Sequence, residues 1–128
     1  MMNSIVSEVK KNMTTGLGTK LGLTTEQLDK GITLAGTVAS KVLKESMVTQ
    51  PTVVNNLFSK EPNTPEATKV VDQIGTTYVG SLTRELGLDA LKASAMKDAV
   101  IPGLTEAITR HTEGNADAIK SLLSGPVM

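Results

Sequence analysis

The sequence predicts an all-α domain in which about seven helical segments pack around a central helix. Apolar residues recur three and four positions apart along most of the chain, and no segment shows the sustained alternation that is typical of strands. Most segments also begin at a good capping residue and end beside a glycine or proline, most clearly at two corners of sequence Leu-Gly-Leu, at 21–23 and 86–88. A length of 128 residues fits one domain over 1–128.

The first helix is expected from about Ser4 to Leu21, with its apolar residues on one face. Gly16 and Gly18 lie in its second half, where each glycine destabilises a helix by about 1 kcal/mol relative to alanine. We therefore expect a kink or a break in that half.

The first corner combines three signals of a helix boundary. Gly22 suits the left-handed conformation that follows a helix end, because a side chain clashes there. Thr24 is a good N-cap, and Gln27, three residues later, completes a capping box. Leu23 and Leu28 are spaced to form a hydrophobic staple across the cap.

The helix that follows is predicted to continue to about Val48, and its wide apolar arc makes it the central helix. Gly31, Ala35 and Ala39 form a ladder of small residues that lets a neighbouring helix pack closely. Its apolar stripe consists of Leu28, Ile32, Ala35, Ala39 and Val42, widened by Leu34, Val38 and Leu43.

The middle of the chain reads as a break at 49–51, a short helix to about Ser59 and a loop at 60–63. Thr64 then caps a helix that has Pro65 at its first position and reaches the second corner. The inward face of this helix is predicted to carry Ala67, Val71, Ile74, Tyr78 and Leu82.

The second corner, at 86–89, repeats the first with Asp89 as the cap, so the corners at 21–24 and 86–89 hint at a faint internal duplication. Pro102, followed by Gly103, predicts either a kinked helix or a fresh start. The apolar pattern here comprises Leu91, Ala95, Met96, Ala99, Val100, Leu104, Ala107 and Ile108.

The last segment is expected to follow a break at Gly114. Asn115 caps a short helix that carries Ile119, Leu122 and Leu123, and Gly125 and Pro126 close it.

The chain has 13 basic and 13 acidic residues, so no net charge draws it to nucleic acid or to an anionic membrane. Residues 1–60 nevertheless carry seven lysines against four acidic residues, and residues 61–128 carry six basic against nine acidic residues. This asymmetry either favours head-to-tail self-association or averages out within the folded domain.

The chain contains no cysteine, which excludes disulfides and thiolate metal sites. Residues 1–11 lack the apolar run of a signal peptide, and no stretch approaches the roughly 20 apolar residues that span a bilayer. We therefore expect a cytoplasmic protein without a membrane span.

Side chains able to do chemistry are sparse. His111 is the only histidine and lies in the last turn of a helix, near Arg110 and Glu113, where the helix dipole already favours it. Tyr78 reads as a core tyrosine with its hydroxyl in water. No acidic cluster resembles a calcium loop. We expect no catalytic residue, no cofactor and no metal site.

Residues 20–32 resemble the turn and second helix of a helix-turn-helix motif. A capped corner accounts for the same residues, and the first half of the chain contains no arginine. The recognition helix would present Thr25, Glu26, Asp29 and Lys30, of which the two acidic residues would repel phosphate.

A longer pattern starts at the second corner: Leu-Gly-Leu at 86–88, an alanine-rich helix to Ala99, Ile101-Pro102, a helix over 104–108, a glycine and a short apolar helix over 118–123. This order resembles the YidB-like proteins, a family of small bacterial helical proteins of unknown function. The chain departs from that pattern by lacking a glycine-rich tract between helices and by its middle segment, 49–65. The resemblance implies a multihelical fold around a central helix and supplies no catalytic residues.

Three functions remain open from the sequence. The first is a non-enzymatic protein that acts through protein contacts, self-association included. The second is a DNA-binding module that uses residues 20–32, and the third is a small-ligand carrier or an enzyme with a pocket between helices near His111 or Tyr78.

Overall fold

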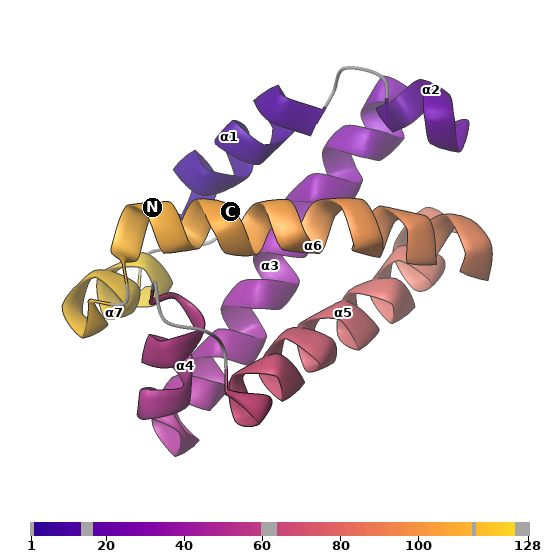
Figure 1. Cartoon of the computed structure of the whole chain (residues 1–128). Helices are drawn as coiled ribbons and strands as arrows, with labels where there is room; N and C mark the ends of the chain where they lie inside the picture. Colours follow the sequence, from indigo (N-terminus) through magenta and orange to yellow (C-terminus); the bar gives the residue numbers. More distant parts are fainter. Residues whose placement is uncertain (1, 14–16, 60–63, 114, 125–128) are drawn as a thin grey trace.

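The computed structural model describes residues 2–13, 17–59, 64–113 and 115–124, and within these ranges the chain forms seven α-helices and no strand. The all-α prediction is therefore confirmed, while the predicted loop at 60–63, the break at Gly114 and the closing Gly125 and Pro126 lie outside the described residues. The helices are α1 (Met2–Met13), α2 (Leu17–Leu21), α3 (Thr25–Thr49), α4 (Pro51–Leu57), α5 (Pro65–Leu86), α6 (Ala90–Thr112) and α7 (Ala116–Ser124) (Figure 1).

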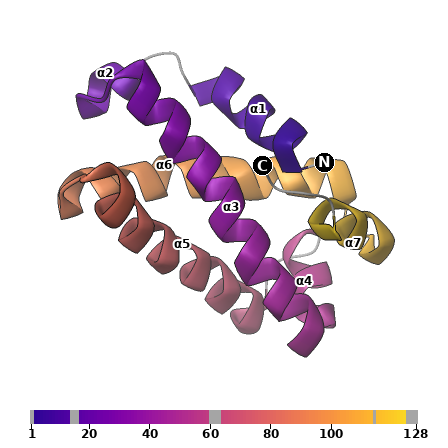
Figure 2. The ribbon, with the colours of Figure 1, turned by 180° about the vertical axis from the view of Figure 1, so that it is seen from behind.

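Two long helices, α3 and α6, cross at the centre of the molecule, with α6 in front of α3 in Figure 1 and behind it in Figure 2. Helix α3 contacts α1, α4, α5, α6 and α7, which confirms the prediction of a central helix. Helix α6 contacts α1, α2, α3, α5 and α7, so it shares the centre. Helices α1 and α5 flank α3 on opposite sides (Figure 2).

The first corner forms as predicted. Helix α1 ends at Met13 and α2 begins at Leu17, so the expected break is present and two helices form instead of one. Gly22 is left-handed, with φ of +69°. Thr24 Oγ1 accepts a hydrogen bond from the Gln27 backbone N–H at 3.0 Å, and Gln27 Oε1 accepts one from the Thr24 N–H at 3.0 Å, which completes the capping box.

The other caps are also confirmed. Gly87 at the second corner has φ of +66°, and Asp89 Oδ1 accepts a hydrogen bond from a backbone N–H of the first turn of α6 at 2.8 Å. Thr64 Oγ1 caps α5 at 3.2 Å, and Asn115 Oδ1 caps α7 at 3.0 Å. Each polar side chain satisfies one of the N–H groups that a helix start leaves without a partner.

Helix α6 continues through Pro102, so the chain makes one helix there rather than a fresh start. Proline has no backbone N–H, and the carbonyl of Asp98, four residues earlier, therefore loses its usual helical donor.

The core consists mainly of aliphatic side chains, with Phe58 and Tyr78 buried among them, and two apolar positions differ from the expected pattern. The side chain of Leu91 is 82% exposed, because the buried stripe of α6 starts at Ala93 and Leu91 falls outside its spacing. On α5, Val70 is buried while Val71 is only partly buried. No helix in the described part of the chain has the length and apolar character that a membrane crossing requires.

Candidate functional site

The lone histidine lies in a polar cluster that ties α1 to the end of α6. His111 Nε2 lies 2.8 Å from Glu8 Oε2, and the Arg110 guanidinium contacts Glu8 Oε1. Arg110 also approaches Glu106 Oε1 at 3.4 Å. The hydrogen bond from His111, and then that from Arg110, holds the pKa of the Glu8 carboxyl below its ordinary value.

This cluster has the geometry of a surface ion-pair network. Glu8, Arg110 and His111 are all at least partly exposed, and both oxygens of the Glu8 carboxylate are already engaged. Among the described residues, no group of three or more His, Cys, Asp or Glu side chains converges as a metal site would require. The cluster therefore fastens the N-terminal helix to the core.

Tyr78 is completely buried, and its hydroxyl donates a hydrogen bond of 2.7 Å to the backbone carbonyl of Gly31 on α3. The prediction that this hydroxyl lies in water was therefore wrong, because α3 and α5 pack closely enough to bring a carbonyl to it. Burial raises the pKa of Tyr78 far above its ordinary value, so the side chain stays protonated and joins the two helices.

The segment 20–32 presents most of its polar residues to solvent, and three of its charged residues form ion pairs. Lys30 Nζ lies 3.2 Å from Glu26, and Asp29 lies 3.1 Å from Lys10 Nζ on α1. Helix α2, which would be the first helix of a DNA-binding motif, has five residues and packs on α6. These contacts occupy the charges that a recognition helix would offer to phosphates.

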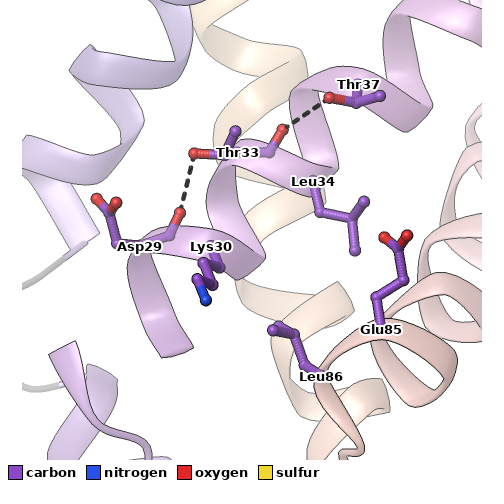
Figure 3. Close-up of a pocket in the computed structure, with 7 residues that line it drawn as sticks. All are labelled: Asp29, Lys30, Thr33, Leu34, Thr37, Glu85 and Leu86. Carbon is purple, nitrogen blue, oxygen red and sulfur yellow. Dashed lines mark hydrogen bonds between the residues drawn. The ribbon is translucent and has the colours of Figure 1, made fainter. Parts of the chain in front are cut away.

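A hollow of about 330 Å³ lies between α3 and α5 (Figure 3). Figure 3 shows Leu34 and Glu85 approaching each other across it. The hydroxyls of Thr33 and Thr37 donate to backbone carbonyls four residues earlier, at 3.0 and 3.3 Å. The two threonine hydroxyls of its lining are thus satisfied within α3. The hollow is lined by Asp29, Lys30, Thr33, Leu34, Thr37, Glu85 and Leu86.

A longer surface groove follows α6 on its side toward α5. It consists of a hollow of about 460 Å³ and a neighbouring one of about 420 Å³, which share Val71 and Pro102. We call it the Pro102 groove. The first hollow is lined by Val71, Asp72, Gly75, Thr76, Lys97, Asp98, Ile101 and Pro102, and the second by Leu57, Ser59, Val71, Pro102, Thr105, Glu106 and Thr109.

The Pro102 groove combines an apolar floor with an acidic rim. The buried Ile101 and the partly buried Val71 supply the floor. The exposed Asp72 and Asp98 line the edge of the larger hollow, together with Lys97 and the exposed Pro102. Asp98 lies 3.5 Å from Lys97 Nζ, whereas Asp72 forms no ion pair with any residue in the described ranges.

The Asp98 carbonyl has no helical donor because residue 102 is proline. The groove is therefore suited to a ligand that offers apolar side chains together with N–H donors or cations.

The sequence offered only one sign of this groove, which is the proline inside a helix. The side chains that line it come from α5, α6, the end of α4 and Ser59 just after it, and packing decides which faces of these helices meet. Neither His111 nor Tyr78 lines it.

Comparison of the chain with protein-family models, with curated proteins and with solved structures finds no match.

Proposed function

We propose that the protein is a binding module that acts through protein contacts, self-association included, and that the Pro102 groove is its binding surface. The observation that carries this proposal is the pairing of an apolar floor with an acidic rim along the exposed side of α6. Protein recognition commonly combines an apolar centre with polar groups that fix orientation. An amphipathic helix lays its apolar side chains into such a groove and its charges along the rim.

The surroundings of the reactive side chains support binding over catalysis. Catalysis by a histidine or a tyrosine requires a side chain that can reach a substrate and exchange a proton. His111 lies in a surface ion-pair cluster and lines neither the hollow between α3 and α5 nor the Pro102 groove, and the Tyr78 hydroxyl is buried on a backbone carbonyl. We accordingly propose no enzymatic activity, no cofactor and no metal.

Family and location belong to the same proposal. The order of corner, proline-containing helix and short final helix supports membership of the YidB-like proteins, which would make the chain a bacterial one. A cytoplasmic location is proposed with it.

Site-directed photo-cross-linking tests this function. A photoreactive amino acid replaces Thr76, which lines the groove, or Ser7, which is exposed on α1 on the opposite side of α3, in cells that produce the protein. We expect protein adducts from position 76 and few from position 7. The absence of protein adducts from position 76 would refute the proposal.

A further inference from the structure

We infer that the occupant of the Pro102 groove is a second copy of this chain, which docks through a basic stripe on α3. The stripe consists of Lys41, Lys44 and Val48, and we call it the α3 stripe. This inference rests on the proposed function and names the partner for the same groove.

The α3 stripe lies on one exposed face of its helix, because its residues are three and four positions apart. Val48 is 85% exposed, which is unusual for an apolar side chain next to a helix end that packs on α4. Lys41 and Lys44 are exposed and form no ion pair with any residue that the structure describes. The stripe thus presents two free cations followed by one apolar side chain.

The Pro102 groove presents the complementary set. Asp72 and Asp98 face the solvent on its rim, and the partly buried Val71 forms its floor with Ile101. Opposite charges on matching surfaces steer association and fix its register.

The complementarity extends to the whole chain. The α3 stripe belongs to the basic first half of the sequence, and the Pro102 groove, apart from Leu57 and Ser59, belongs to the acidic second half. Two different surfaces meet in this contact, so it is head-to-tail, and a pair of copies keeps a free groove on one copy and a free stripe on the other. Association is therefore expected to grow beyond dimers as concentration rises.

A charge-exchange experiment tests the inference. One variant carries Lys41→Glu and Lys44→Glu, and a second carries Asp72→Lys and Asp98→Lys. All four positions are exposed, and circular dichroism verifies that each variant keeps the helical content and melting temperature of the parent. Sedimentation velocity of the parent, of each variant and of the mixture is then measured over a range of concentrations and at low and high salt.

The parent is expected to associate more weakly as salt rises, because salt screens exposed charges. Each variant alone should associate at least about tenfold more weakly, because like charges then face each other. The mixture should recover association, since every contact between unlike variants again pairs opposite charges.

If the parent associates but neither variant changes this, the α3 stripe and the groove are not the contact, and the inference is wrong while self-association through another surface stands. A parent that stays monomeric at about 1 mM overturns the inference as well, because its binding free energy would then be weaker than about −4 kcal/mol. In that case photo-cross-linked adducts of position 76 with other proteins would still support the proposed function. The absence of such adducts would refute both the proposed function and this inference.

Discussion

Two glycines of α5 and its corner provide a matched test of how the chain ends its helices. Gly80 lies inside α5 and Gly87 follows its last residue, and both are exposed. A Cβ atom added at either position meets no heavy atom within 4 Å. The two positions therefore differ in backbone conformation alone, helical at Gly80 and left-handed at Gly87, with φ of +66°.

The expected effects of alanine at these positions have opposite signs. Gly80→Ala should raise the free energy of unfolding by about 1 kcal/mol, because alanine loses less backbone entropy than glycine in a helix. Gly87→Ala should lower it by about 1 kcal/mol, because a side chain in the left-handed region costs about 1–2 kcal/mol and the smaller entropy of the unfolded alanine chain offsets part of this.

Urea unfolding followed by circular dichroism at 222 nm measures both effects. In thermal unfolding of a chain of this length, a change of about 1 kcal/mol in unfolding free energy shifts the melting temperature by about 3–5 °C. The shift should be upward for Gly80→Ala and downward for Gly87→Ala. Gly22→Ala, with φ of +69°, should behave like Gly87→Ala. Shifts of the same sign at positions 80 and 87 would refute the left-handed geometry of the corner.

Four further changes test other contacts. Tyr78→Phe should lower the free energy of unfolding by about 1–2 kcal/mol in urea titrations, because it removes a buried hydrogen bond; an unchanged midpoint contradicts this. Thr24→Ala should cost about 1 kcal/mol in thermal melts through loss of the capping box, whereas Thr25→Ala should cost little. Because the pKa of Glu8 is lowered in the folded state, ionised Glu8 stabilises the fold at pH values above the ordinary carboxyl pKa, and this stabilisation is lost as pH falls through the lowered pKa. Glu8→Gln should therefore flatten the acid side of a curve of unfolding free energy against pH, and an unchanged slope contradicts this. Pro102→Ala should raise the melting temperature, because it restores a helical donor to the preceding turn, and should weaken self-association in sedimentation; a lower melting temperature contradicts the first expectation.

The helix boundaries could be predicted because their signals are local. Thr24 with Gln27, and Asp89 after Gly87, each lie within a few residues of the helix start that they specify. Short-range hydrogen bonds and the left-handed glycine leave little for the rest of the molecule to decide.

The polar contacts across the fold could not be predicted in this way. Glu8 and His111 are 103 residues apart, and the hydroxyl of Tyr78 finds a carbonyl 47 residues away. Nothing near either residue in the sequence indicates its partner, because the contact depends on how α1, α3, α5 and α6 cross. The exposure of Leu91 was missed for a related reason, since the first turn of α6 lies outside its buried stripe.

The Pro102 groove lies between these two cases. Pro102 and Asp98 are close in sequence, and the loss of a helical hydrogen bond at this point follows from the proline itself. That Val71 and Asp72 of α5 lie opposite is a result of packing. The residue type therefore indicates where α6 is unusual, and only the fold shows that a groove is built there.

Directed disulfide formation between two variants tests the head-to-tail contact most directly, because the chain has no cysteine of its own. Val48→Cys places a thiol on the α3 stripe, and Thr76→Cys places one in the Pro102 groove. Under mild oxidation, the mixture of the two variants should form covalent heterodimers well before either variant forms homodimers. Homodimers that form as fast as heterodimers would contradict a contact between the stripe of one copy and the groove of the next.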